Sequence, residues 1–232
     1  MPFDAGLIDA SRAALIQQHN MDIISNNLAN VNTSGFKADR LIFNDMLDRQ
    51  IKSVHSQGPL RYTENPLDVA IGGEGFFRVQ TAKGIKLTRD GSFKMLSDGS
   101  LVNSQGQKVL GQGGAPITLN PEGGLIHIDD KGGITQGSEQ VGALEVVDVK
   151  DKKTLVKEGA NLFGGQDGKA PVTTAATDYT VQQGAVEQAN VEVVSEMVNM
   201  INSFRSYESY QKVIQAVQDM DSKTVNQVGR VA

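Results

Sequence analysis

Residues 26–37 read NNLANVNTSGFK, and this stretch decides where an N-terminal helix ends. Asparagine, serine and threonine side chains compete for backbone hydrogen bonds, so they favour helix ends and turns. Gly35 can adopt the open backbone conformation that a sharp exit from a helix needs. We therefore expect a helix terminus tied by side-chain amides, with Asn27, Asn30, Asn32 and Gly35 also available for contacts with neighbouring subunits. A helix cap and loop without further purpose is the alternative.

The sequence before this stretch has a heptad pattern. One set of positions, seven residues apart, holds Leu7, Ala14, Met21 and Leu28, and the positions three further on hold Ala10, Gln17, Ile24 and Val31. This pattern predicts one long helix within residues 1–31. Because two of the eight residues are alanine and one is glutamine, the stripe buries little apolar surface. The helix therefore needs packing neighbours for its stability.

The C-terminal part of the chain, residues 184–232, also predicts a long helix. No glycine or proline occurs between Gly184 and Gly229. Apolar residues first follow steps of three and four and then drift to another face; they are Val194, Met197, Ile201, Phe204, Tyr207, Tyr210, Ile214, Val217 and Met220. We expect the two terminal helices to form a coiled-coil-like domain. The alternative is that both helices pack on the middle of the chain.

The middle of the chain has the character of a β domain. Only three of the 25 glycines lie outside the segment from Gly58 to Gly184. Pairs such as Asp90-Gly91 and Asp98-Gly99 separate short apolar runs, and such pairs favour hairpin turns because they tolerate positive φ. We predict an all-β domain of short strands over residues 71–183, and hence an α+β fold. Residues 32–70 form a connector in which Phe43, Met46, Leu47, Ile51 and Val54 have helical spacing, which suits a short helix or an extended arm.

Composition argues against catalysis. The 232 residues include no cysteine, which excludes thiolate metal sites and cysteine nucleophiles. The three histidines provide few ligands for a zinc site. A net charge of −5 argues against a nucleic-acid partner. The phosphate-loop and dinucleotide patterns fail at the required glycines, and Asp129-Asp130 reads as a solvated turn. We therefore expect no cofactor, no metal and no enzymatic activity; a hydrolase using Asp129, Asp130 or Glu145 is the remaining enzyme alternative.

Targeting signals are missing from the expected places. Asp4 and Asp9 stand where a signal peptide would carry basic residues, and no uncharged apolar run approaches the ~20 residues that span a bilayer. We expect no membrane insertion. The protein is expected either to stay in the cytoplasm or to leave by a route that removes nothing from its N-terminus.

Several blocks of sequence resemble those of one family in the same order. After residues 26–37 come QGPL (57–60), NPLDVAI (65–71), GEGFF (73–77) and TRDGSF (88–93). Near the C-terminus follow QGAVEQANV (183–191), EMVNMI (196–201), RSYE (205–208) and KVIQ (212–215). Together these blocks resemble the rod and hook axial proteins of the bacterial flagellum. Among them, the short chain is most similar to the proximal rod proteins and next to the distal rod proteins.

The resemblance implies a structural subunit of the flagellar basal-body rod. Such a subunit is exported by the flagellar type III apparatus and assembles with other rod and hook axial proteins, and with copies of itself, into a hollow helical tube that transmits torque across the periplasm. The terminal helices, residues 1–31 and 184–232, would form the inner tube domain, with the β domain outside. A non-flagellar adhesin or binding module with a coiled-coil stalk is the alternative, although aromatic residues, which such modules expose, make up only 5% of the chain.

The candidate assembly residues lie on the two terminal helices and at the end of the first one. They are Leu7, Ala14, Met21, Ile24, Asn27, Leu28, Asn30, Asn32, Gly35, Val194, Met197, Ile201, Phe204 and Ile214. We expect both termini to be mobile in a lone subunit and to become ordered in the tube, because the stripes bury too little to hold a helix alone.

Overall fold

The protein, described here by a computed structural model, is seen over residues 2–43, 49–165 and 170–228. The chain divides into two compact units. Unit 1 comprises Met1–Ala29, Asp39–Ile51 and Glu192–Ala232, and unit 2 comprises Asn30–Ala38 and Lys52–Val191. The chain therefore crosses between the units four times, and unit 1 is assembled from segments that are far apart in the sequence.

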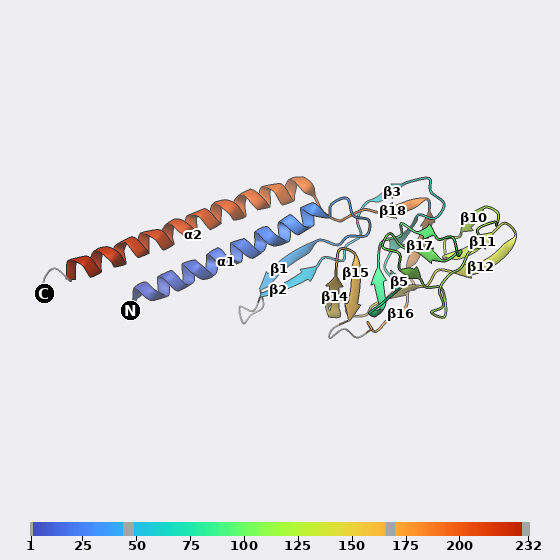
Figure 1. Ribbon diagram of the computed structural model, residues 1–232, viewed down its shortest axis with the longest axis horizontal. Helices are drawn as coiled ribbons and strands as arrows, with labels where there is room; N and C mark the ends of the chain where they lie inside the picture. Colours follow the sequence, from blue (N-terminus) through green and yellow to red (C-terminus); the bar gives the residue numbers. More distant parts are fainter. Residues whose placement is uncertain (1, 44–48, 166–169, 229–232) are drawn as a thin grey trace. The chain divides into compact units, whose positions relative to one another are not determined.

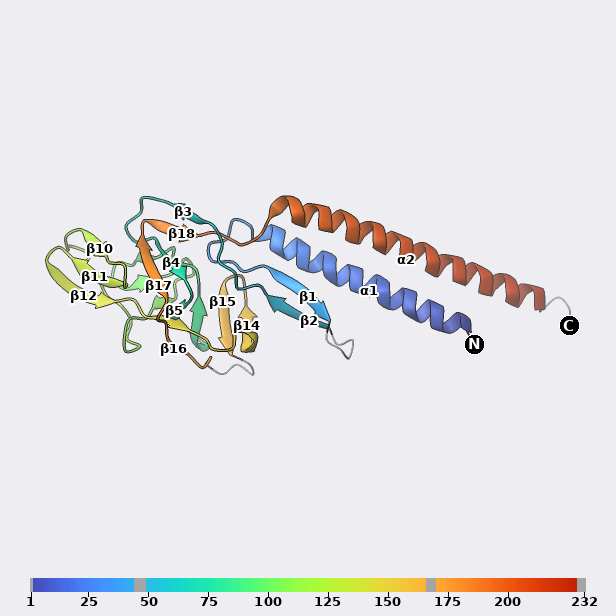
Figure 2. The same ribbon diagram turned by 180° about the vertical axis from the view of Figure 1, so that it is seen from behind.

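Unit 1 is built from the two ends of the chain. It contains the helices α1 (Pro2–Ala29) and α2 (Val193–Val228), which lie side by side and run antiparallel (Figures 1 and 2). Proline suits the first turn of α1 because its missing N–H has no partner there. The α+β class with one helix at each end of the chain is as predicted.

The coiled-coil-like pairing of these helices was the wrong part of the prediction. Val194, Met197, Ile201 and Phe204 are 71%, 49%, 52% and 53% exposed, so they do not form a buried seam. The less exposed positions of α2 follow another line, which includes Val193, Glu196, Met200, Ser203, Tyr207, Tyr210, Ile214 and Val217. The physical reason is that α2 turns a partly polar face inward and keeps its most apolar face outward.

The connector is extended where the structure describes it. Strands β1 (Asp39–Phe43) and β2 (Arg49–Ser53) form a two-stranded sheet, and β1 contacts α1. Of the two alternatives left by the helical spacing in this region, the extended chain is therefore observed on both sides of residues 44–48. Met46 and Leu47, which contributed to that spacing, lie outside the described residues.

Unit 2 is dominated by one antiparallel sheet of nine strands. Its main path runs in the order β14, β15, β6, β5, β9, β8 and β7, and β13 joins it by pairing with β5 and β16. These strands are β5 (Phe76–Thr81), β6 (Gly84–Thr88), β7 (Lys94–Met95), β8 (Leu101–Val102), β9 (Lys108–Val109), β13 (Val146–Asp148), β14 (Leu155–Glu158), β15 (Leu162–Gly165) and β16 (Thr174–Ala175). A 3-10 turn, η1 (Lys152–Thr154), precedes β14.

Three smaller antiparallel sheets complete unit 2. One has three strands, β10 (Ile126–Ile128), β11 (Gly133–Gln136) and β12 (Glu139–Ala143). The second pairs β4 (Val69–Gly73) with β17 (Tyr179–Gln183), and the third pairs β3 (Leu60–Tyr62) with β18 (Ala185–Glu187). The last two sheets join residues from the start and the end of unit 2.

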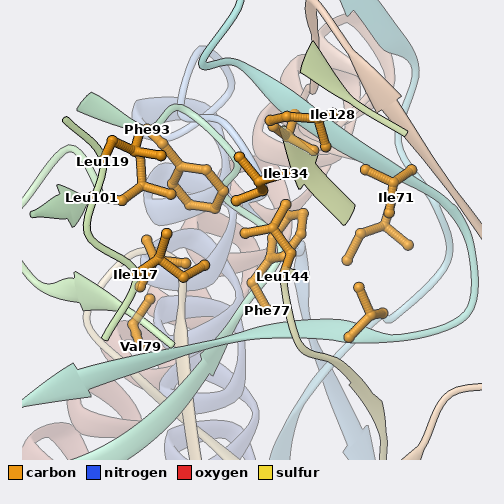
Figure 3. Packing of buried hydrophobic residues seen from close by; sticks show 14 of the residues in the cluster. Ile71, Phe77, Val79, Phe93, Leu101, Ile117, Leu119, Ile128, Ile134 and Leu144 are labelled. Atoms are coloured by element: carbon orange, nitrogen blue, oxygen red, sulfur yellow. The ribbon is translucent and has the colours of Figure 1, made fainter. Parts of the chain in front are cut away.

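Apolar side chains from these sheets share one core. Figure 3 shows Phe77, Phe93, Ile134 and Leu144 packed together, all at most 1% exposed. The rings of Phe77 and Phe93 meet edge to face with their centroids 5.2 Å apart. Burial of this kind contributes about 25 cal/mol per Å² of apolar surface. Unit 2 therefore has a hydrophobic core of its own.

Candidate assembly surfaces

The predicted stripe of α1 is largely sheltered. Ala14 and Ile24 are buried, and Leu7, Met21 and Leu28 are half-buried. On the other side of this helix, Ile8 and Leu15 are about half exposed. The heptad pattern therefore identifies the inward face of α1 correctly, and it leaves two apolar residues on the outward face.

The predicted residues of α2 divide into two groups. Val194, Met197, Ile201 and Phe204, which we call the outer row, are exposed together with the adjacent Val198, whereas Ile214 is half-buried. A contiguous exposed apolar patch on a protein in water is typical of an interaction site. The outer row is therefore the candidate for contact with another molecule.

A polar groove lies inside unit 1, between α1, β1 and α2. It has a volume of about 520 Å³, and its lining includes Gln17, Asn27, Asp39, Glu196, Asn199 and Ser203. Since Glu196 and Ser203 belong to the less exposed line of α2, this line faces α1 and β1. The contact between the helices thus depends on polar side chains as well as apolar ones.

Asn27 fastens the end of α1 to the start of β1. Its Nδ2 donates to the carbonyl oxygen of Asp39 at 2.9 Å, and its Oδ1 accepts from the Asp39 N–H, also at 2.9 Å. Asn27 is 1% exposed. The side-chain amide of Asn27 therefore bonds to the backbone of Asp39 as a paired β-strand would. Both bonds lie within one chain, not between subunits.

The rest of the asparagine-rich stretch forms a turn in unit 2. The N–H of Thr33 donates to the carbonyl of Asn30 at 3.0 Å, while the Asn32 side chain is exposed. Gly35 has φ +68°, and a Cβ at this position would lie 2.3 Å from the amide nitrogen of Asp90. Gly35 is therefore required both by its left-handed backbone and by the close approach of a second chain segment.

Three charged residues meet in the interior of unit 2. Glu187 Oε1 accepts from Lys37 Nζ at 2.5 Å and from the Gly58 N–H at 2.9 Å, and Glu187 Oε2 accepts from Arg89 Nη1 at 3.1 Å. All three side chains are at most 3% exposed. A buried charge is tolerated only when it is paired and hydrogen-bonded. We call Lys37, Arg89 and Glu187 the buried ion cluster.

The cluster holds two cations for one carboxylate, and backbone carbonyls complete the coordination. Lys37 Nζ also donates to Ser56 O at 2.7 Å, and Arg89 Nη2 donates to Gly73 O at 2.7 Å. Burial lowers the pKa of Lys37 below its ordinary value, and the adjacent Glu187 carboxylate opposes this shift. Burial likewise lowers the pKa of Arg89, again against the effect of Glu187.

Asp90 is a second buried ionisable group of unit 2. Its carboxylate accepts from the Ser92 N–H at 3.0 Å, from Ser104 Oγ at 2.9 Å and from Asn161 Nδ2 at 3.0 Å. Burial raises the pKa of Asp90 above its ordinary value, although these hydrogen bonds favour the charged form. The network ties Asp90 to two distant loops of unit 2.

Sequence reasoning missed the ion cluster as a site. Lys37, Arg89 and Glu187 each lie in a block that carries the family resemblance, but a charged residue is normally expected at the surface. The available signal was that these blocks hold few charges: Lys37 is alone in residues 26–37, Glu187 is alone in residues 183–191, and residues 88–93 hold Arg89 and Asp90. Each charge then needed a buried partner, and the three blocks supply one another.

The described residues contain no group of three or more histidine, cysteine or acidic side chains placed to hold a metal. Among their helices, none combines the length and apolar character needed to cross a bilayer.

Comparison with known proteins identifies the family. Residues 9–37 match the model described as "Flagella basal body rod protein", residues 70–136 match "Flagellar hook protein FlgE/F/G D1 domain", and residues 182–228 match "Flagellar basal body rod FlgEFG protein C-terminal". The flagellar basal-body rod protein FlgF of Caulobacter vibrioides is 32% identical over 228 residues, which cover 91% of this chain and 92% of the relative. This chain belongs to the flagellar basal-body rod protein family.

Two further relatives agree with this assignment. FlgF of Mesorhizobium japonicum is 34% identical and covers 81% of this chain and 83% of its own length. FlgG of Buchnera aphidicola subsp. Acyrthosiphon pisum is 35% identical, with coverage of 79% and 84%. The prediction of a structural rod subunit of the basal body, most like FlgF and next like FlgG, is confirmed. The protein is not an enzyme, and the adhesin alternative is excluded by the family.

Proposed function

We propose that this rod subunit joins other flagellar rod and hook axial proteins, and copies of itself, in a hollow helical tube that transmits torque. The observation that carries the proposal is the outer row of α2. Val194, Met197, Ile201 and Phe204 are each at least 49% exposed on a helix of a rod-family chain. Covering such a row with the helix of a neighbouring subunit removes apolar surface from water and stabilises the tube.

The division of labour along the chain follows the same proposal. The helices within residues 1–31 and 184–232 form the inner wall of the tube, residues 32–70 connect them, and residues 71–183 form the outer β domain. The independent core of unit 2 supports this division, because an outer domain must fold without help from the helices. The protein reaches the rod through the flagellar export apparatus, and the weak helix pair of unit 1 becomes fully stable only when neighbouring subunits cover the outer row.

The candidate assembly residues act in two ways. The outer row and Asn32, which are exposed, contact neighbouring subunits directly. The sheltered residues set the shape of the surface that a neighbour meets; they are Leu7, Ala14, Met21, Ile24, Asn27, Leu28, Asn30, Gly35 and Ile214. Asn27 is the clearest of these, since its two bonds to Asp39 fix β1 against the end of α1.

Replacement of the outer row tests the proposal. Ile201→Gln and Phe204→Gln remove apolar surface at exposed positions, so the isolated subunit is expected to keep its stability within about 0.5 kcal/mol. Incorporation into basal bodies, measured by immunoblot of purified basal bodies and by motility of complemented cells, is expected to fall sharply.

Gln215→Ser is the matched control, because Gln215 is an exposed polar residue of the same helix. It is expected to leave both stability and incorporation unchanged. Normal rods built from the Ile201→Gln, Phe204→Gln double variant would refute the role of the outer row.

A further inference from the structure

The last segment of unit 2, residues 179–190, crosses strands from the first part of the same unit. Its two strands pair with β4 and β3 (Figure 2). Between and after them, the Gly184 N–H donates to Asp68 O at 2.8 Å and the Gln188 N–H donates to Pro59 O at 2.9 Å. Within the described residues, the strand partners of β3 and of β4 both come from this segment. We call residues 179–190 the strap.

Three side chains of the strap each join two or more other segments. Gln183 Nε2 donates to Pro66 O and to Ile126 O, both at 2.9 Å. Glu187 pairs with Lys37 and Arg89 in the buried ion cluster and also accepts from the Gly58 N–H.

Asn190 continues the pattern beyond the second strand of the strap. Its Oδ1 accepts from the Ala38 N–H at 2.7 Å, and its Nδ2 donates to Val54 O at 2.7 Å. The strap therefore holds together the segments of unit 2 that lie next to the chain crossings into unit 1.

Docking of the strap is costly in chain entropy. The contacts of Gln183, Glu187 and Asn190 just described reach residues 117, 150 and 152 positions away in the sequence. Contacts this far apart in the sequence form late in folding, after the intervening chain is ordered, and docking then costs the conformational entropy of the strap residues themselves. The strap is thus the part of unit 2 whose native contacts are the least local.

The docked strap also leaves polar atoms unsatisfied. Within the part of the chain that the structure describes, Arg89 Nε and Gln182 Oε1 are buried without a hydrogen-bond partner. Arg89 contacts the strap through Glu187, and Gln182 belongs to the strap itself. Each such atom lowers the stability of the docked state, because undocking would return it to water.

We propose that residues 179–190 form a closing strap whose undocking is a separate opening of unit 2, with Glu187 as its lock. In the docked state, the strap completes the two sheets that contain β3 and β4, and the charge of Glu187 neutralises one of the two buried cations. In the undocked state, Lys37 and Arg89 reach water, while the nine-stranded sheet keeps its own pairing. The device gives unit 2 two states, closed and partly open.

Hydrogen exchange of the full-length protein, followed by mass spectrometry at low denaturant concentrations, tests the strap. Amides of β3, β4, β17 and β18 are expected to exchange together, through one opening that leaves β5 and β6 protected. Glu187→Gln removes the charge that pairs with both cations and is expected to accelerate exchange of this set on the order of 100-fold. Protection of β5 and β6 should change little.

Glu158→Gln is the matched control. Glu158 Oε1 accepts from the buried Lys86 Nζ at 2.5 Å. This is also an ion pair of unit 2, but it does not involve the strap. This variant is expected to affect β14 and β6 and to leave the strap amides unchanged. Equal acceleration of every strand by Glu187→Gln, or none at all, would overturn the proposal.

Gln183→Ala and Asn190→Ala keep the test decisive if Glu187→Gln does not fold. Each removes contacts from one end of the strap without leaving a buried charge unpaired. Both are expected to accelerate the same set of amides, with a smaller factor than Glu187→Gln. If the two variants accelerate different sets, the strap does not move as one element and the inference is wrong.

Discussion

At the scale of single residues, Asn27 and Asp90 show how buried polar groups fix distant segments. Asn27 makes two bonds to one residue of β1, and Asp90 collects three bonds from three residues. A buried polar group left without its partner costs far more than a satisfied one contributes. Such residues therefore specify one arrangement of the chain more strongly than they stabilise it.

Replacement of Asn27 is expected to loosen β1 from α1. Asn27→Ala removes both bonds to Asp39 and leaves a buried gap, so we expect the free energy of unfolding to fall by about 1–3 kcal/mol. Urea unfolding followed by circular dichroism measures the change. Asn32→Ala, at an exposed position of the same stretch, should stay within about 0.5 kcal/mol of the parent. An equal loss in both variants would contradict the role of Asn27.

Asp90 predicts a pH dependence with a definite sign. Its pKa in the folded protein is raised, so between its ordinary pKa and the raised one the folded state holds a proton that the unfolded state has released. The contribution of Asp90 to stability is therefore fully present below the ordinary pKa and is lost as the pH rises through the raised pKa. The difference in unfolding free energy between the parent and Asp90→Asn, measured from pH 3.5 to 7, should fall with increasing pH. A difference that grows with pH would contradict this assignment.

At the scale of elements, hydrophobic periodicity predicted α1 better than α2. The stripe of α1 contains Ala14 and Ile24, which are buried, so its apolar pattern marks the inward face. In α2 the most apolar row is exposed, and the inward line includes Glu196 and Ser203. Periodicity reports which face avoids water, and in a subunit that face can belong to an interface with another molecule. The inward face of α2 was therefore not readable in the first half of the helix, whereas the apolar positions Tyr207, Tyr210, Ile214 and Val217 mark it in the second half.

The β elements show a similar limit. Glycine-rich turns revealed a β domain, but the pairing of β3 and β4 with strands more than a hundred residues later had no local signal. The buried ion cluster was missed for the same reason, because its members become partners only after those strands pair. Local patterns thus predicted the elements, and the long-range contacts that join them came from the structure.

Substitution of a small residue on α1 tests how closely the two helices pack. Ala14 is 4% exposed, so Ala14→Leu adds volume at a filled site and is expected to destabilise the helix pair by about 1–3 kcal/mol. We expect a loss of helical signal in circular dichroism and less protein in pelleted polymers. Leu15→Ala, which changes a half-exposed neighbour, is the control for the helix pair. Wild-type behaviour of Ala14→Leu would mean that α1 does not pack there.

At the scale of the whole molecule, the two units differ in what holds them together. Unit 2 has a shared apolar core, a buried ion cluster and sheets closed by its own last residues. Unit 1 depends on two long helices whose contact includes a polar groove and whose outer row remains in water. Unit 2 should therefore fold without unit 1, provided that the truncated chain still includes the strap.

Two truncated chains make this dependence measurable. A chain ending at Val191 lacks α2 but keeps the strap, and we expect unit 2 to unfold cooperatively with its core amides protected. A chain ending at Asp178 lacks β17, β18 and Glu187, so β3 and β4 lose their strand partners and Lys37 and Arg89 lose the carboxylate that pairs with them. The shorter chain should therefore stay in the partly open state and be sensitive to protease at β3 and β4. Limited proteolysis and hydrogen exchange compare the two directly, and equal protection of both chains would show that unit 2 closes without its last twelve strap residues.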